Sequence, residues 1–139
     1  MLTVTRTVEF CAAHRLYNPD WDDARNREVF GKCSNPGGHG HNYSVTVTVT
    51  GPLDQESGMI VNVATLAGIL KREVVEQLDH RNLNTDVDFL VGEITTMENI
   101  ALKLAQRLKP TVAALGLSLI RLELAESDKN SVTWRENDG

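Results

Sequence analysis

Basic residues are in short supply in this sequence of 139 residues, which has 14 lysines and arginines against 19 aspartates and glutamates and a formal charge of −5. No long basic run offsets that balance, so the composition argues against a general nucleic-acid surface. Cysteine is scarce too, with only Cys11 and Cys33 present. A chain of this length folds without a disulfide, and thiols in a reducing compartment stay free, so the two cysteines can have separate roles.

Long apolar runs are also missing. No uninterrupted apolar stretch approaches the ~20 residues that a membrane helix needs, and no basic-then-apolar segment at the N-terminus resembles a signal peptide. We therefore expect a cytoplasmic protein with no membrane partner. No internal repeat, low-complexity tract or Pro/Ser-rich linker divides the chain, so residues 1–139 are expected to form one domain.

The sequence does contain clear strand patterns. Leu2–Phe10 and Tyr43–Thr50 alternate apolar with polar residues and are rich in valine and threonine, which predicts two strands with one buried face each. Leu117–Glu126 and Ser131–Arg135 have the pattern of two further strands joined by a short turn. Cys11 continues the first alternating strand and is expected in the core.

Two helices are predicted between these pairs of strands. Apolar residues recur at helical spacing from about Val63 to Leu78. Thr95-Thr96-Met97-Glu98 fits the S/T-x-x-E capping box of a second helix, which Pro110 is expected to kink or end. The order strand, strand, helix, helix, strand, strand favours an α+β fold with an antiparallel sheet over a doubly wound parallel one. Such a sheet has two edges that pairing with another subunit would cover.

Three of the four histidines fall in two segments of small residues. His39 and His41 flank Gly40, and residues i and i+2 of an extended segment point to one face, so the two imidazoles can converge. His14 follows a predicted strand that can pair with the one beginning at Tyr43. Three imidazoles leave one tetrahedral position open, which is typical of catalytic zinc. A histidine pair beside glycines is equally compatible with a surface turn.

Cys33 is a candidate for proton transfer. It lies next to Lys32 and six positions before His39, and nearby positive charge or a metal favours the thiolate. The fourth histidine, His80, follows Asp79 where the first predicted helix ends, a place where the helix dipole disfavours a negative charge. A cysteine with a histidine and a carboxylate in reach suits proton transfer, although an ordinary polar helix end would also explain this pair.

Four separated parts of the sequence share one known pattern. They are Phe10-Cys11-Ala12-Ala13-His14-Arg15-Leu16, the loop GKCSNPGGHGHNY from Gly31 to Tyr43, Leu78-Asp79-His80-Arg81-Asn82-Leu83, and Thr96-Met97-Glu98-Asn99 followed by Glu126-Ser127-Asp128-Lys129-Asn130. In this order they resemble the 6-pyruvoyltetrahydropterin synthase family. The resemblance covers nearly the whole chain and includes all four histidines.

The resemblance implies a tunnelling fold (T-fold). In that fold each subunit has a four-stranded antiparallel sheet with two helices, the sheets of three subunits close a barrel, and two trimers stack as a homohexamer. Active sites lie where subunits meet, so the residues of one site need not come from one chain.

The resemblance also implies roles for individual residues. The zinc ligands would be His14, His39 and His41. The catalytic groups would be Cys33, Asp79 and His80. Glu126 would anchor the pterin ring, because a carboxylate can accept two N–H donors side by side. Thr96 and Glu98 fall at positions of the pterin pocket, although capping explains them almost as well, and a charged strand end would explain Glu126.

The implied reaction converts 7,8-dihydroneopterin triphosphate to 6-pyruvoyl-tetrahydropterin with elimination of triphosphate, as in tetrahydrobiopterin synthesis. The triphosphate needs local cations, for which the candidates are Arg15, Arg25, Arg27 and Lys32.

Two alternatives stay open. The first is 6-carboxy-5,6,7,8-tetrahydropterin synthase of the queuosine and deazapurine pathways, in which three residues commonly separate the cysteine from the histidine pair. Here five residues separate Cys33 from His39, which favours the pyruvoyl product. The second is a non-catalytic oligomer that binds metal or pterin.

Overall fold

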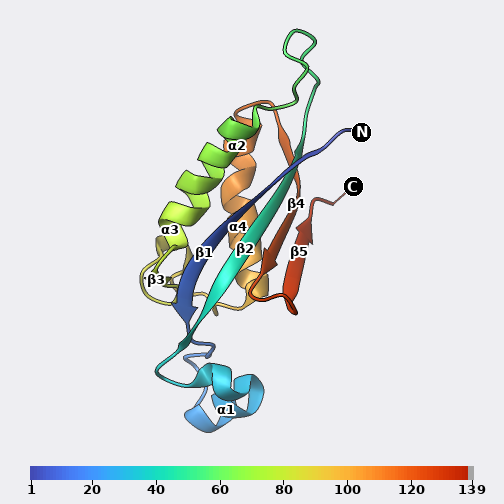
Figure 1. The fold of residues 1–139 in the computed structure, drawn as a ribbon. Helices are drawn as coiled ribbons and strands as arrows, with labels where there is room; N and C mark the ends of the chain where they lie inside the picture. The colour runs from blue at the N-terminus through green and yellow to red at the C-terminus, as the bar shows by residue number, and fades with distance from the viewer. Residues whose placement is uncertain (138–139) are drawn as a thin grey trace.

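A computed structural model describes residues 1–137 and shows an α+β fold built on one sheet (Figure 1). The sheet has five strands in the order β3-β1-β2-β4-β5. The strands are β1 (Val4–His14), β2 (His39–Thr50), β3 (Arg81–Asn82), β4 (Ser118–Ala125) and β5 (Ser131–Arg135). The expected four-stranded sheet is therefore corrected to five strands, because the two-residue β3 pairs in parallel with the end of β1. The other neighbouring strands are antiparallel.

The long antiparallel pair of β1 and β2 sets the register of the sheet. It runs from Val4 opposite Val49 to His14 opposite His39. Alternation along β2 buries Val45, Val47 and Val49 on one face, as the period of two requires. Both strands extend beyond their predicted ends at Phe10 and Tyr43. The extension places the histidines in strands rather than in a glycine loop.

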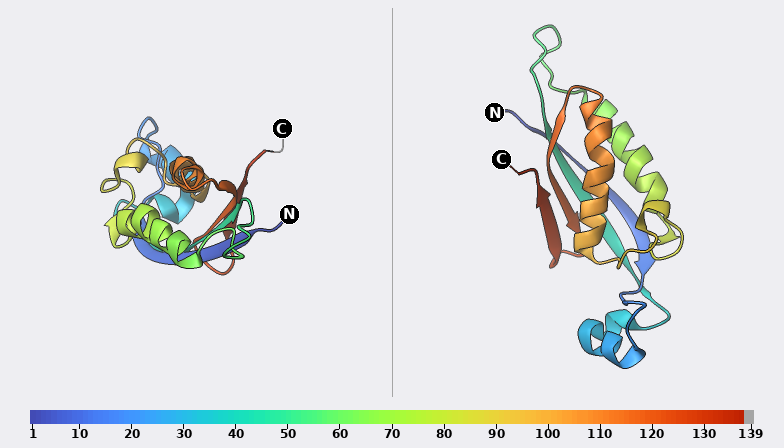
Figure 2. Two further views of the ribbon diagram at one scale, coloured as in Figure 1. Left: turned by 90° about the horizontal axis from the view of Figure 1, so that it is seen from above. Right: turned by 180° about the vertical axis from the view of Figure 1, so that it is seen from behind.

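Two long helical segments cover the same face of the sheet and leave the other face free of helices (Figure 2). The first joins α2 (Val63–Leu70), a π-helical turn (Lys71–Val75) and α3 (Glu76–Leu78). The second is α4 (Met97–Ala113). Their apolar stripes pack on the sheet and form the core, whose fully buried residues include Leu66, Leu70, Leu104, Leu108, Val47 and Leu122. No helix among residues 1–137 combines the length and the apolar character needed to cross a membrane.

The start and end of α4 differ from the prediction. Its N-cap is Thr96, whose hydroxyl accepts the Asn99 N–H at 3.2 Å, so the cap lies one residue after Thr95. Glu98 consequently lies outside a capping box. The helix also continues through Pro110 to Ala113 rather than ending at the proline.

A small lobe between β1 and β2 was not predicted. It contains α1 (Asp23–Phe30) and a 3₁₀ turn (Gly31–Ser34), and it projects beyond the end of the sheet (Figures 1 and 2). The one buried residue of α1 is Asn26, so the helix has no apolar stripe for the sequence to display. With α1 and β3 added, the predicted element order is corrected to strand, helix, strand, helix, strand, helix, strand, strand when α2 and α3 count as one rod.

Candidate metal centre and active site

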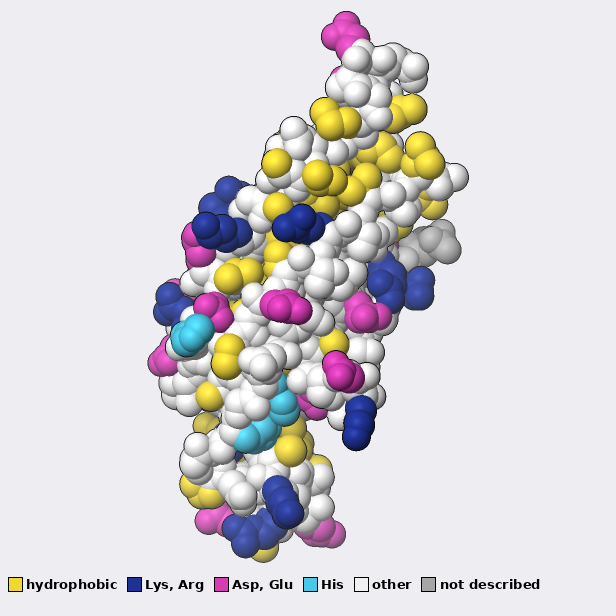
Figure 3. All heavy atoms as spheres, in the orientation of Figure 1, with side chains coloured by type: hydrophobic (Ala, Val, Ile, Leu, Met, Phe, Trp, Pro, Cys, Tyr) yellow, Lys and Arg dark blue, Asp and Glu magenta, His cyan; other side chains and the backbone are white. Residues whose placement is uncertain are grey.

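Three histidine side chains meet where β1 ends and β2 begins. His14 pairs with His39 across the strands, and His41 lies two residues further along β2 on the same face. One ring nitrogen of each lies within 4.8 Å of those of the other two. The ring centroids are 4.6, 4.9 and 5.2 Å apart. Figure 3 shows histidine side chains at this end of the molecule, next to the lobe.

His14 is held in one orientation by the main chain. Its Nδ1 lies 2.9 Å from the carbonyl oxygen of Thr95. Because a carbonyl only accepts, Nδ1–H donates and Nε2 keeps its lone pair for a ligand. Burial lowers the pKa of His14 to about 4, and the neighbouring His39 and His41 add to that effect against the opposing hydrogen bond to Thr95. The ring is therefore neutral near pH 7, which is the form that binds metals.

The other two histidines fit the same interpretation. Burial lowers the pKa of His39, and the charge of His41 lowers it further. The Nε2 of His41 lies 3.7 Å from Oε2 of Glu126, the residue after β4. Three imidazoles converge with a carboxylate beside them, which fits a tetrahedral metal site with one position open for water or substrate.

The ring of Tyr43 lies against those of His14 and His41, and Tyr43 was not singled out from the sequence. Its hydroxyl lies 3.4 Å from Nε2 of His14, and its fully buried ring stacks on Phe10 at a centroid distance of 5.0 Å. Burial raises the pKa of Tyr43, so it stays a neutral phenol. The signal for it was available, because Tyr43 continues the spacing of two from His39 and His41.

Cys33 lies in the 3₁₀ turn of the lobe and is partly buried. Its carbonyl oxygen accepts the Leu16 N–H at 2.8 Å, and Nε of Arg15 donates to the Ser34 carbonyl at 2.7 Å. These bonds tie the turn to the two residues that follow His14. The backbone of the predicted catalytic cysteine is thereby fixed beside the segment that carries a predicted metal ligand.

Asp79 and His80 form a second group, at the end of α3. One carboxylate oxygen of Asp79 accepts the Cys11 N–H at 2.9 Å, and the other lies 2.8 Å from Nδ1 of His80. The hydrogen bond from Cys11 and then that from His80 lower the pKa of Asp79. His80 has φ of 60°, a conformation uncommon outside glycine, and its side chain is 80% exposed. Asp79 thus orients a histidine that faces solvent.

The structure does not join these two groups within one chain. Among residues 1–137, no hydrogen bond or ion pair links Cys33 with Asp79 or His80. Thr96 and Glu98 lie at the start of α4, where the Thr96 hydroxyl caps the helix and Glu98 is exposed. The structure therefore places the predicted catalytic residues in two local groups, one in the lobe and one at the end of α3.

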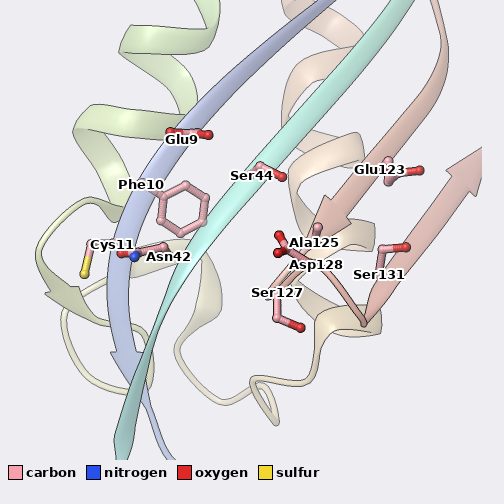
Figure 4. A pocket seen from close by; sticks show the side chains of 10 residues that line it. All are labelled: Glu9, Phe10, Cys11, Asn42, Ser44, Glu123, Ala125, Ser127, Asp128 and Ser131. Atoms are coloured by element: carbon pink, nitrogen blue, oxygen red, sulfur yellow. The ribbon is translucent and has the colours of Figure 1, made fainter.

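Cys11 is the clear error among the predictions. It is exposed, not part of the core. Phe10 and Ala12 point to the helices, so Cys11 between them points to the helix-free face. There it lines a hollow of about 630 Å³ together with polar residues that include Asn42, Ser44, Glu9 and Glu123 (Figure 4).

The whole chain was compared with known proteins. A sequence model described as 6-pyruvoyl tetrahydropterin synthase matches residues 3–137. The chain belongs to the 6-pyruvoyl tetrahydropterin synthase family. The predicted resemblance is therefore confirmed.

Individual relatives support the same assignment to the 6-pyruvoyl tetrahydropterin synthase family. A Pongo abelii protein named 6-pyruvoyl tetrahydrobiopterin synthase is 41% identical over 95% of this chain and 90% of its own length. The solved structure of Caenorhabditis elegans 6-pyruvoyl tetrahydropterin synthase superposes with a TM-score of 0.87 at 36% identity, covering 98% of this chain and 96% of the other. A more distant relative, from Halobacterium salinarum, is named "Probable 6-carboxy-5,6,7,8-tetrahydropterin synthase" and is 34% identical over 84% of this chain and 65% of its own length.

Proposed function

We propose that this protein converts 7,8-dihydroneopterin triphosphate to 6-pyruvoyl-tetrahydropterin and triphosphate, as a lyase of tetrahydrobiopterin synthesis. The observation that carries the proposal is the three-histidine cluster with one open position, in a member of this family that also has a cysteine fixed nearby. We further propose that residues 1–139 form one domain and that the protein acts on a small-molecule pterin in the cytoplasm.

We infer that the metal is zinc and that His14, His39 and His41 hold it. The neutral imidazole of His14 supports this, and so does its bond to the Thr95 carbonyl, because metal-binding histidines usually donate their second N–H to such an acceptor. Bound zinc would supply a Lewis acid for the oxygens of the substrate side chain and so make the neighbouring C–H groups more acidic.

Cys33 takes the proton-transfer role in this proposal. As a thiolate it moves protons between carbons of the substrate side chain. The electron pair of one C–H bond that it breaks forms the double bond of an enol as the C–O bond to triphosphate breaks, and that enol then tautomerises to the ketone. His80 accepts and returns the thiol proton, and Asp79 keeps its Nδ1–H in place through the 2.8 Å contact.

This role requires a second copy of the chain. The His80 side chain is 80% exposed at the edge of the sheet. Within residues 1–137, it makes no hydrogen bond with Cys33. We infer that the Asp79–His80 pair of one subunit serves the Cys33 of another in a homohexamer of two trimers. The sheets of three subunits would close a barrel in this assembly and cover the strand edges.

Glu126 is the proposed anchor of the pterin ring. Its side chain is 21% exposed and lies next to His41, so a ring held by its two oxygens would bring the substrate side chain to the histidines. Thr96 and Glu98 stay predictions for the same pocket. The Thr96 hydroxyl also accepts the Asn99 N–H at the start of α4.

The alternative function is 6-carboxy-5,6,7,8-tetrahydropterin synthase. The Halobacterium salinarum relative favours keeping it, while the five residues between Cys33 and His39 favour the pyruvoyl product. The deciding experiment incubates purified protein with dihydroneopterin triphosphate, with and without a chelator, and identifies the product by mass. A 6-pyruvoyl product lost with the chelator is expected. A 6-carboxy product with acetaldehyde supports the alternative, and no product with retained pterin binding supports a non-catalytic oligomer.

A further inference from the structure

Four cations were predicted as candidates for triphosphate, and the structure separates them into two pairs. Nε of Arg15 donates to the Ser34 carbonyl at 2.7 Å, and its guanidinium lies 4.4 Å from the centroid of the Tyr17 ring. The Arg25 guanidinium lies 4.1 Å from the centroid of the Trp21 ring. Both side chains therefore have a structural partner within the chain. Among residues 1–137, the side chains of Arg27 and Lys32 make no ion pair or cation–π contact.

Arg27 and Lys32 line one hollow of the lobe, of about 260 Å³, together with Gly31 and Asn35. None of the ion pairs within residues 1–137 involves either cation. The acidic residues of the lobe are absent from the lining. A cation in the last turn of α1 is favoured by the helix dipole, which explains Arg27 as a helix stabiliser. It does not explain Lys32, which reaches the same hollow from the following turn.

This hollow lies close to the histidines along the chain. Asn35 is four residues before His39, so at most about 14 Å of extended chain separates their backbones. The connection is shorter than that limit, since it turns through the hydrogen bond from the Gly38 N–H to the Asn35 carbonyl at 2.9 Å. In Figure 3, Lys and Arg side chains gather on the lobe below the histidines.

The structure assigns the hollow formed by Arg27, Gly31, Lys32 and Asn35 as the subsite for the outer phosphates of the substrate, an inference that rests on the proposed function. The guanidinium of Arg27 can donate two parallel hydrogen bonds to a phosphate, Lys32 adds a point charge, and the Asn35 amide adds a neutral donor. In a chain of formal charge −5, these cations give a polyanion one place to bind. The pterin end would lie at Glu126, next to His41.

The test measures binding of inorganic triphosphate to the zinc-loaded full chain by titration calorimetry. Arg27→Gln and Lys32→Gln are each expected to weaken binding about tenfold, the loss of one hydrogen bond to a charged group. The matched control is Arg25→Gln, which removes the same charge from the same helix and is expected to leave binding within about twofold of wild type. Lys32→Arg keeps the charge and is expected to retain most of the affinity. Equal loss in Arg25→Gln, or none in Arg27→Gln and Lys32→Gln, overturns the assignment.

A second measurement separates this inference from the proposed reaction. Inorganic triphosphate is titrated into the His39→Ala chain with and without Arg27→Gln, so that chelation of the metal cannot account for the signal. The same loss of about tenfold is expected there. If wild type yields no product from dihydroneopterin triphosphate while Arg27→Gln and Lys32→Gln still lose triphosphate binding, the reaction is wrong and the subsite stands. If wild type turns over and both variants keep its KM and its triphosphate affinity, the subsite alone is wrong.

Discussion

Individual residues at the end of β1 show how main-chain and side-chain chemistry combine. His14 is 2% exposed and donates to the carbonyl of Thr95, a residue that follows it by 81 positions. The register of β1 and β2 brings His39 and His41 to the same place. Strand pairing therefore brings the three rings together, and the bond to the Thr95 carbonyl orients that of His14 without a metal.

Replacing Cys33 separates a proton-transfer role from a ligand role. We expect Cys33→Ala to lower kcat by at least about 100-fold, the size of a lost general acid or base, and to leave the zinc content unchanged. The measurements are turnover of dihydroneopterin triphosphate and the ratio of metal to protein. Cys11→Ala is the matched control, because Cys11 is exposed on the helix-free face, and we expect it to stay active.

His39→Ala gives the opposite pattern to Cys33→Ala and serves as its second control. Loss of one of three imidazoles should remove both zinc and turnover. If Cys33→Ala also loses its zinc, the thiol is a ligand and the proton-transfer assignment is wrong.

At the scale of single residues, the sequence predicted the histidine cluster but not its support. The spacing of two aligned His39 with His41, and the order of the strands supplied His14. The acceptor for His14 is the main-chain carbonyl of Thr95, which every residue type has, so the sequence does not indicate this hydrogen bond. Cys11 was misplaced because it was assigned to the core as a continuation of the first strand, although the alternation from Phe10 to Ala12 places it on the other face.

Among the elements, the start of α4 connects stability with the site. The cap at Thr96 holds the first turn of the helix directly after the carbonyl that orients His14. We expect Thr96→Ala to lower the free energy of unfolding by about 1 kcal/mol, the cost of a lost N-cap, as measured by urea denaturation. Thr111→Ala is the control in the same helix, because the Thr111 hydroxyl only bonds back to the Arg107 carbonyl. Equal loss in the two variants would contradict the capping role.

The elements that could be predicted are those with a strong apolar period. Alternation of apolar and polar residues predicted β1, β2, β4 and β5. Apolar residues at helical spacing predicted two helical segments, one from α2 to α3 and the other α4. The lobe helix α1 buries Asn26 and no apolar residue, so its period carried no signal. β3 has only two residues. It forms where the chain after α3 lies against β1, and there the His80 N–H donates to the Cys11 carbonyl at 2.6 Å. Tertiary contacts of this kind are invisible in a local pattern.

At the scale of the whole molecule, one edge of the sheet is paired with β3 over only two residues. Along β1, β3 pairs only with Ala12 and Ala13. The same edge of β1 from Val4 to Cys11 is not paired with β3. The Asp79–His80 pair faces solvent beside this edge, while Cys33 belongs to the lobe. The proposed number of subunits and the proposed partner of His80 do not follow from the sequence pattern, because a local pattern does not show which surfaces would meet between copies.

Subunit mixing tests whether the site is shared between chains. Cys33→Ala and His80→Asn chains are each expected to be inactive alone, and asparagine tolerates the positive φ at position 80. If each site takes Cys33 from one chain and His80 from another, random co-assembly of equal amounts restores both groups at about a quarter of the sites. Activity is measured on co-expressed chains whose mixed composition is verified by native mass spectrometry. Co-assembled chains that show no more activity than two inactive separate variants would mean that Cys33 and His80 act within one chain, and an active His80→Asn chain would mean that His80 has no part in the reaction. Recovery near a quarter of wild type instead requires a neighbouring subunit to bring its Asp79–His80 pair to Cys33, because no single chain in the mixture has both groups.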